Sequence, residues 1–561
     1  MATGNSGADR TTTGWLKPPK AIGGLDHLGV QAQCVALYAE MLPGITNVTD
    51  RARFFTFHPW FVWALEKRLR AVPSEPEHAR WLRAAECLVT LIAIRHRETT
   101  GESAEIHDVA TPGSSKLGAA YAGLDETGEI DLREYSAFKG ERSNERHYLK
   151  ARWGGLDQYI GSLIDLRLMD QTEHAPRQPG YGKRLGAAAA HVFAQGVPGD
   201  RFFEVLERGR VTVDELDALS AFCPCQIKHR EHEREFLTEL MFARRADAQD
   251  DGREERRDSL LLLLELAKIS EPERLEWTLR ASAYSGCFPA DEPWSLSAGL
   301  ERTRKRWRTY HRNELFSVAL QGVFWVVLQA VERRLRGRLR SVAAAGDLLV
   351  AIASESALAE SLRLPFDAFV DGFARDLPSI GAWEDPKHEH HRAYEIVDIA
   401  RTTDVTDDES LISTLEQSVG VLATLIARRR ESEPENPYAD FALKPRTGDE
   451  LDLASLESAL PTWAGLSLEE WLRWVATNWG VRRHLQVALR KLHQGGQDTF
   501  RLRPIDEGLQ FVEVAPASFT GPRVNKAQQL LVDLGLIARA EDGLLRITAL
   551  GEIELELGRH V

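Results

Sequence analysis

Apolar residues recur at every third or fourth position along most of this chain, which is the pattern of amphipathic helices that pack on a core. Turn-forming pairs such as Pro43-Gly44 interrupt the pattern and separate one helix from the next. Patterns typical of strands appear after residue 499, and residues 129–175 look mixed. We therefore expect a mainly α fold, with helices at 29–42, 77–98, 183–195, 231–243, 259–268, 314–340, 345–362, 366–375 and 408–431.

Two stretches without this periodicity suggest how the chain is divided. Residues 244–258 are highly charged and contain a glycine, and residues 432–450 hold several prolines and charges. We read the first as a surface loop or boundary and the second as a linker. The predicted organisation is a disordered tail over 1–15, a helical domain over 16–245, a second over 259–431, the linker 432–450, and an α+β domain over 451–561.

The C-terminal region alternates helix and hairpin patterns. Residues 499–513 read as two strands about a turn at 506–508, residues 521–535 as a helix, and residues 536–550 as strand, Glu-Asp-Gly turn and strand. The run KAQQLLVDLGLIARAEDGLLRITALGEIEL resembles the end of a winged-helix domain, in which a helix is followed by a hairpin wing and a last short helix. The resemblance makes the expected fold class a large multi-helix body with a C-terminal winged-helix-like α+β domain.

This resemblance implies binding of duplex DNA by a recognition helix that enters the major groove. The helix would lie over residues 523–534, and the base-reading or phosphate-contacting side chains would be Arg523, Asn525, Lys526, Gln528, Gln529 and, on the wing, Arg546. Basic and acidic residues are almost balanced from 481 to 561, although phosphate binding depends on many cations. The module is therefore either a DNA reader or a winged helix that docks on protein.

Composition excludes several classes of protein. The chain has 561 residues, 43% of them apolar, so it can bury a core and is not disordered as a whole. Its net charge of −14 argues against a general nucleic-acid coat, and five cysteines are too few for a disulfide scaffold. Arginine greatly outnumbers lysine, which favours a GC-rich bacterial source.

The sequence also predicts a compartment. The N-terminal residues lack a basic start followed by an apolar run, so we expect no secretory signal. The apolar segment 315–331 is short for a membrane span and contains Ser317, Gln321 and Gln329, so we read it as a core helix. We expect a cytoplasmic protein with reduced thiols and no membrane association.

Basic residues are concentrated around that apolar segment, with Glu314 and Glu332 as the acidic residues inside the range. Arginine forks suit phosphate, and nearby aromatic residues suit stacking, so this set is a candidate nucleic-acid surface. The other interpretation is two solvated helix ends that flank a buried helix. The set comprises Arg302, Arg304, Lys305, Arg306, Arg308, Arg312, Arg333, Arg334, Arg336, Arg338 and Arg340.

Candidate metal and catalytic residues are few. Cys223, Cys225, His229 and His232 place four nitrogen or sulfur donors within ten positions, although the spacing differs from that of common zinc motifs. Arg306 and His311 match the Arg-x4–6-His spacing of helical HEPN ribonucleases. No phosphate-binding loop, nucleophile elbow or HExxH motif occurs, so we expect no cofactor and lean toward a non-catalytic protein.

Together these features predict a non-catalytic bacterial subunit that binds DNA or docks on a DNA-processing partner within a multi-subunit assembly. The segment LPGITNVTDRARFFTFHPW resembles uncharacterised bacterial proteins found near DNA-processing or antiphage genes, which suggests a defence or mobile-element context. The alternatives are a HEPN-like ribonuclease or other nuclease, and a scaffold that binds only protein.

Overall fold

The computed structural model describes residues 26–124, 128–137, 148–172, 175–245, 253–288, 292–401, 407–432, 438–441, 451–493 and 498–559. The predicted tail over 1–15 lies outside these ranges, and so does most of the predicted linker over 432–450. Helices account for 65% of the residues and strands for 7%, with small sheets near the C-terminus. The expected mainly α fold with a C-terminal α+β part is confirmed.

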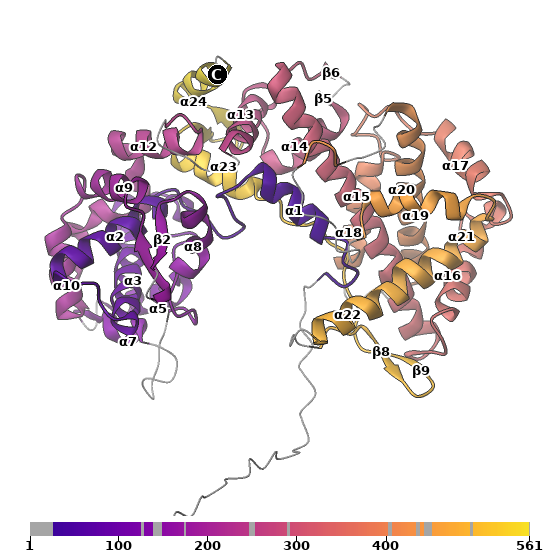
Figure 1. Ribbon diagram of the computed structural model, residues 1–561, viewed down its shortest axis with the longest axis horizontal. Helices are drawn as coiled ribbons and strands as arrows, with labels where there is room; N and C mark the ends of the chain where they lie inside the picture. The colour runs from indigo at the N-terminus through magenta and orange to yellow at the C-terminus, as the bar shows by residue number, and fades with distance from the viewer. Residues whose placement is uncertain are drawn as a thin grey trace, which may run out of the picture.

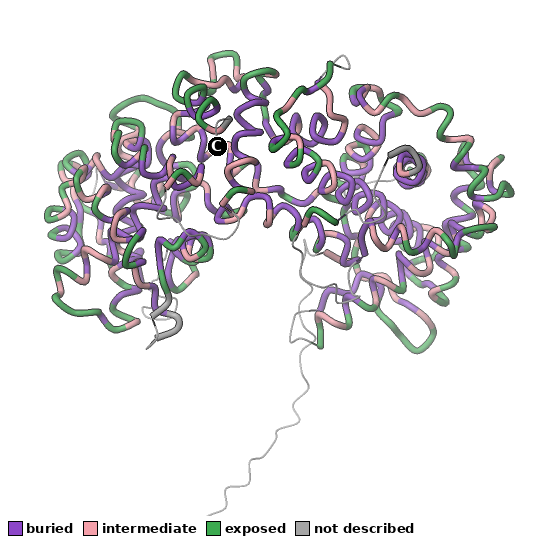
Figure 2. The backbone as a smooth tube through the Cα atoms, turned by 45° about the horizontal axis from the view of Figure 1, so that its top comes forward, coloured by how far each residue is buried: buried purple, intermediate pink, exposed green. Residues whose placement is uncertain are grey.

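The helices form an arch with two lobes, joined across the top by a set of bridging elements (Figure 1). Burial follows this arrangement, since the interior of each lobe and the bridge between them hold most of the buried backbone (Figure 2). The bridge combines distant parts of the chain: α1 (Ala32–Met41), α13 (Arg253–Ser270), α14 (Leu275–Ser285), α23 (Val524–Asp533), β10 (Ile537–Arg539), β11 (Leu545–Ile547) and α24 (Ala549–Arg559).

The N-terminal lobe is built on an aromatic core. Trp60 packs against Phe193 and Phe222 with ring centroids 4.9 and 5.3 Å apart. A proline inside a helix predicts a break or a kink, and α2 continues through Pro59 without a break. The elements are α2 (Phe54–Leu69), α3 (Glu75–Thr100), α4 (Ala104–His107), α5 (Ser114–Ala122), β1 (Ile130–Asp131), α7 (Leu132–Ser136), α8 (Leu156–Asp165), β2 (Met169–Thr172), β3 (Ala175–Tyr181), α9 (Leu185–Ala194), α10 (Gly199–Arg208), β4 (Arg210–Val211), α11 (Val213–Ala218), η1 (Ser220–Phe222), η2 (Pro224–His229) and α12 (Glu231–Met241).

The second lobe surrounds one long helix, α15 (Ala298–Arg334), whose apolar middle is almost entirely buried. The other elements are β5 (Cys287–Phe288), β6 (Glu292–Pro293), β7 (Arg338–Leu339), α16 (Ala344–Ser354), η4 (Ala359–Ser361), α17 (Phe366–Arg375), α18 (Glu389–Arg401), α19 (Asp408–Ser432), α20 (Leu453–Trp463), α21 (Leu468–Trp474), η5 (Val475–Arg482), α22 (Arg483–His493), β8 (Leu502–Ile505) and β9 (Gly508–Phe511). By length and composition alone α15 and α19 are able to cross a membrane, but 94% and 72% of their apolar windows are buried inside the protein.

Two predicted local features have different outcomes. Both C-terminal hairpins form, β8–β9 about Asp506-Glu507 and β10–β11 about residues 541–543. The two hairpins belong to separate sheets. In the sheet of β8 and β9, strand β9 also pairs with β7 from the middle of the chain. The charged stretch 244–258 is not wholly a loop, because helix α13 begins at Arg253 and buries the Arg256 side chain against the backbone carbonyls of Met241 and Leu240.

Candidate functional site

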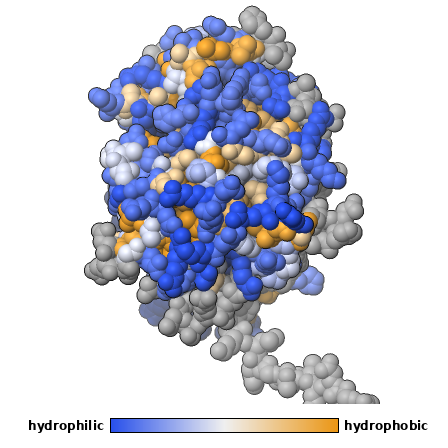
Figure 3. All heavy atoms as spheres, turned by 90° about the vertical axis from the view of Figure 1, so that its left-hand side faces the viewer, coloured by the Kyte–Doolittle hydropathy of each residue, from blue (hydrophilic) through white to orange (hydrophobic). Residues whose placement is uncertain are grey.

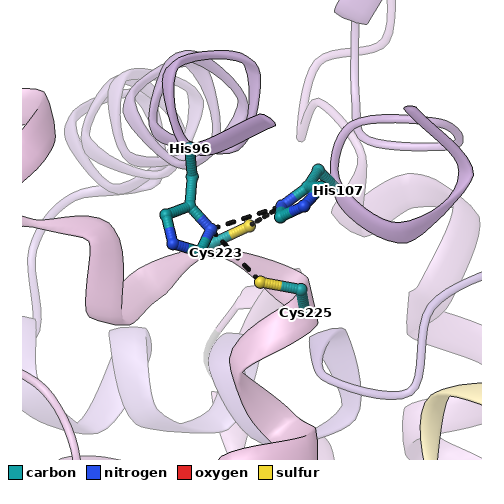
Figure 4. A group of neighbouring side chains, drawn as sticks. All are labelled: His96, His107, Cys223 and Cys225. Carbon is teal, nitrogen blue, oxygen red and sulfur yellow. Dashed lines mark hydrogen bonds between the residues drawn. The ribbon is translucent and has the colours of Figure 1, made fainter. Parts of the chain in front are cut away.

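Four metal-ligating side chains converge at the inner side of the N-terminal lobe. His96, His107, Cys223 and Cys225 point toward one another from α3, α4 and the η1–η2 segment (Figure 4). Their ligand atoms all lie within 4.8 Å of one another, and three of the four residues are buried. Among the residues that the structure describes, this is the group with the composition and spacing of a metal centre.

Local backbone features bring these side chains together. Helix α3 carries His96 near its end and stops at Gly101, whose φ of +69° is the left-handed conformation that ends many helices. The chain then turns into α4, which ends at His107. Cys223 lies between the two short 3-10 helices, and Pro224 begins η2 so that Cys225 follows on the same side.

A buried arginine supports the turn that carries His107. The guanidinium of Arg51 donates to the carbonyls of Ile106 and Val109 at 2.7 and 3.3 Å. The Nε of Arg51 also donates to Asp533 on α23 at 3.1 Å, so the turn is connected to the C-terminal module. Because both side chains of this ion pair are almost fully buried, removing either one leaves the other charge uncompensated.

The donor atoms are in close contact. His96 Nδ1 lies 3.3 Å from His107 Nδ1, Cys225 Sγ lies 3.3 Å from His96 Nδ1, and His107 Nδ1 lies 3.3 Å from Cys223 Sγ. The Nε2 of His107 is 2.9 Å from a carboxylate oxygen of Glu102, which orients the ring with Nδ1 toward the thiols.

The surroundings shift the pKa values of the two thiols in opposite directions. A hydrogen bond from the Cys223 thiol, helped by neighbouring His96, lowers the pKa of Cys225 to about 6. Burial raises the pKa of Cys223. One thiol is therefore set up to be a thiolate near neutral pH, which is the form that binds metals.

The sequence prediction identified half of this group. Cys223 and Cys225 are present as expected, but His229 and His232 are exposed and do not join it, so the predicted ligand set is corrected at these two positions. Both histidines follow the cysteines into η2 and α12, where their side chains face solvent. The observed histidines lie more than a hundred positions earlier in the chain, and no local spacing indicates that pairing.

The predicted catalytic pair is not assembled. Arg306 and His311 are five positions apart on α15, so they lie on different sides of the helix. Arg306 forms ion pairs with Glu40 and Glu255. His311 instead contacts His390 at 3.0 Å in the core, where burial lowers its pKa well below the usual value. The ribonuclease prediction for this pair is corrected.

The cations around α15 do not form one surface. The helix has 37 residues and is about 55 Å long, so the clusters before and after its apolar middle lie at opposite ends. Arg304, Arg306 and Arg312 are buried, and this excludes them from contact with a duplex. Arg308 is partly buried. Arg333 and Arg334 pair with acidic side chains, including Asp408 and, for Arg334, Glu355. The exposed members are Arg302, Lys305, Arg336, Arg338 and Arg340.

The polar side chains of α23 are engaged by other parts of the chain. Lys526 forms an ion pair with Asp50, and Asn525 donates to Glu276. The Gln528 side chain accepts the backbone N–H of Leu275 at 3.1 Å.

The other predicted DNA contacts of the module are also engaged. Arg523 donates to the carbonyl of Leu42 at 3.3 Å, and Gln529 donates to Asp533 at 3.0 Å. Arg546 on the wing pairs with Glu271 and Asp542. The residues expected to read DNA are therefore engaged within the protein, several of them by carboxylates.

The last helix presents a different surface. Leu550, Ile553 and Leu557 of α24 are 41%, 55% and 42% exposed, and their spacing places them on one face of the helix. Leu555 is buried on the other side, where α24 packs against α13. Seen from the end of the N-terminal lobe, the surface is mostly hydrophilic with separate apolar patches (Figure 3).

A cavity of about 470 Å³ lies between the metal-ligating group and the C-terminal module. Its walls come from the η2 region, the 103–106 turn, α23 and the wing, so both candidate sites border the same space. The polar residues that line it include Arg51, Cys225, Lys228, Gln528, Gln529 and Arg539. Comparison with protein-family models, curated proteins and solved structures finds no match for this chain.

Proposed function

We propose that the protein is a non-catalytic docking subunit of a DNA-processing assembly, and that its C-terminal module binds protein rather than reading DNA. The proposal rests on a difference between the polar side chains of α23 and the apolar side chains of α24. The polar side chains of α23 are held by contacts within the protein's own chain, whereas three apolar side chains of α24 are open to solvent without being part of the core.

Docking of α23 in a DNA groove would require several internal contacts to break. Lys526 would have to leave Asp50, and Asn525 would have to leave Glu276. The carboxylates then exposed would repel the phosphate backbone, whose binding depends on cationic contacts. In this conformation, binding of the polar side chains of α23 to a duplex is therefore unfavourable.

The apolar face of α24 is suited to a hydrophobic groove on a partner. Single exposed aliphatic residues are common on protein surfaces, but three on one helical face form a contiguous patch. Amphipathic helices that bind grooves use anchors with this i, i+3, i+7 spacing. Leu550, Ile553 and Leu557 are the proposed anchors.

The remainder of the proposal rests on the sequence. The winged-helix resemblance supports an association with DNA processing, and the predicted bacterial, cytoplasmic and antiphage context stays a prediction. The exposed cations Arg336, Arg338 and Arg340 are the surface on which a direct DNA contact would be sought. The two alternatives are a nuclease, for which Arg306 and His311 supply no assembled site, and a scaffold without any DNA association.

Photo-crosslinking tests the docking surface. A photoreactive amino acid at position 553, expressed in the native host, should form a discrete adduct with one protein. The matched control is position 72, because Val72 is 61% exposed and follows α2 in the N-terminal lobe, outside the bridge that contains α24. Equal adducts at both positions would contradict the docking surface. An adduct whose partner has no nucleic-acid function would favour the scaffold.

Fluorescence anisotropy tests the role of DNA. We expect the isolated protein to show little salt-sensitive binding to a labelled duplex, and a Lys526→Ala variant to behave in the same way. Tight binding that high salt weakens and Lys526→Ala abolishes would overturn the proposed role of the module. Binding lost only in an Arg336/Arg338/Arg340→Glu variant would assign a direct DNA contact to that edge of the second lobe.

A further inference from the structure

We infer that His96, His107, Cys223 and Cys225 bind one Zn²⁺ ion in a closed structural site. Two imidazoles and two thiols are a donor set that zinc takes in many structural centres. The inference does not depend on the docking function, because all four ligands lie in the N-terminal lobe.

The spacing of the donor atoms matches the edges of a zinc tetrahedron. With Zn–N bonds of about 2.0–2.1 Å and Zn–S bonds of about 2.3 Å, a tetrahedral site separates two nitrogens by about 3.3 Å and a nitrogen from a sulfur by about 3.6 Å. The distance between His96 Nδ1 and His107 Nδ1 is 3.3 Å, and each of these nitrogens also lies 3.3 Å from a sulfur. Three of the six donor pairs therefore have spacings close to those of a zinc tetrahedron, and all four ligand atoms lie within 4.8 Å of one another (Figure 4).

A second shell of contacts fixes the coordinating atom of one histidine. Glu102 accepts the Nε2–H of His107 at 2.9 Å, and Thr100 Oγ1 lies 3.3 Å from the same nitrogen. With its proton on Nε2, the ring presents the Nδ1 lone pair to the two cysteines. Carboxylate–histidine pairs of this kind support the ligands of known zinc sites.

The four protein ligands indicate a structural role. Catalytic zinc sites keep one position for water or substrate, whereas structural sites fill all four positions with protein donors. The ion would link the end of α3 and the α4 turn to the η1–η2 segment, across sequence separations of 116 and 129 residues. The same turn is held by Arg51, which contacts α23, so the ion would also stabilise the wall on which the C-terminal module rests.

Other cysteine chemistry fits less well. Two thiols are too few for an iron–sulfur cluster held by four cysteines. A Rieske cluster takes two cysteines and two histidines but binds them to different iron atoms, which does not fit imidazole nitrogens only 3.3 Å from the sulfurs. A mixed imidazole and thiolate set also accepts copper, so the experiment measures both metals.

Metal analysis of the purified full-length protein tests the inference. Protein prepared without chelators should contain about one zinc per chain, and Co²⁺ exchanged into it should show the strong visible absorption of tetrahedral cobalt with thiolate ligands. A Cys223→Ser/Cys225→Ser variant should lose at least about nine-tenths of the zinc. A His229→Ala/His232→Ala variant is the matched control and should retain it, because these two neighbouring histidines are exposed and outside the group.

The outcomes separate clearly. Wild-type protein that contains less than about a tenth of an equivalent of zinc, and gives no tetrahedral cobalt spectrum, would overturn the inference. Copper in place of zinc, or loss of the metal in the His229/His232 control with retention in the cysteine variant, would also overturn it. Where the cysteine variant does not fold, the cobalt spectrum of the wild type and its loss in His96→Ala decide the question.

Discussion

Replacement of Glu314 by alanine should destabilise the protein strongly, because this carboxylate joins three distant segments in the core. Arg280 on α14 donates to it at 2.7 Å, and the side chains of this pair are 2% and 1% exposed. The backbone N–H of Thr520 also donates to it, as does the Thr520 hydroxyl. Glu314 thus connects α14 and α15 to the segment that leads into α23.

The expected loss follows from burial. Removing one partner of a fully buried ion pair leaves an uncompensated charge and costs about 3–5 kcal/mol. In Glu314→Ala the Arg280 guanidinium keeps Glu276 as a partner, at 3.0 Å, so we expect a value near the lower end, about 3 kcal/mol. An exposed pair such as Arg68–Glu207, with side chains 29% and 46% exposed, should be worth less than about 1 kcal/mol.

Urea denaturation followed by circular dichroism measures this difference. Glu314→Ala is compared with wild type and with the exposed-pair control Glu207→Ala. An Arg280→Met/Glu314→Leu variant should recover part of the loss, because apolar residues can replace a buried ion pair without leaving a charge behind. A Glu314→Ala protein that unfolds within about 1 kcal/mol of wild type, like the control, would refute the argument.

Two further predictions concern pH and backbone strain. Burial lowers the pKa of His78 from 6.5 to about 4, so only the unfolded chain binds its proton between these values. The stability that this residue contributes should be complete above pH 6.5 and be lost by up to about 3 kcal/mol toward pH 4, in addition to the losses from other buried histidines such as His484, as measured by urea midpoints across this range. His78→Gln should flatten that dependence, and an unchanged slope would contradict the assignment. Gly44→Ala should cost about 1–3 kcal/mol, since φ is +75° and the new Cβ would lie 2.8 Å from Leu166. Gly535→Ala, at φ +73° with open space around it, should cost less when both variants are compared by urea denaturation, and equal losses would remove the steric part of the argument.

Much of the secondary structure was predictable, because helices and hairpins depend on residues close together in sequence. The turn residues at 506–508 and 541–543 lead to β8–β9 and β10–β11 as expected, and the helix predicted over 521–535 is α23. Local patterns were less informative where packing overrides them, as in α2, which continues through Pro59, and in the charged residues of 253–258, which begin α13.

The candidate sites were predictable only in part. Cys223 and Cys225 attracted attention because two cysteines lie two positions apart, but their histidine partners come from α3 and α4. Nothing in the spacing of His96 and His107 relates them to residues more than a hundred positions later. His229 and His232 lie much closer to the two cysteines in sequence, but both side chains are exposed to solvent.

The sequence by itself determined which segments are helical, where the chain turns and that the protein is mainly α, because those properties arise from periodicities of two to four residues. Only the tertiary structure decided what the charged and metal-ligating residues do. The basic residues around α15 are separated by the length of one helix, and several are neutralised by Glu40, Asp408 and Glu355 from distant segments. The physical reason is that ion pairs and metal ligands depend on distances of a few ångströms in space, which folding sets between residues that are tens to hundreds of positions apart in sequence.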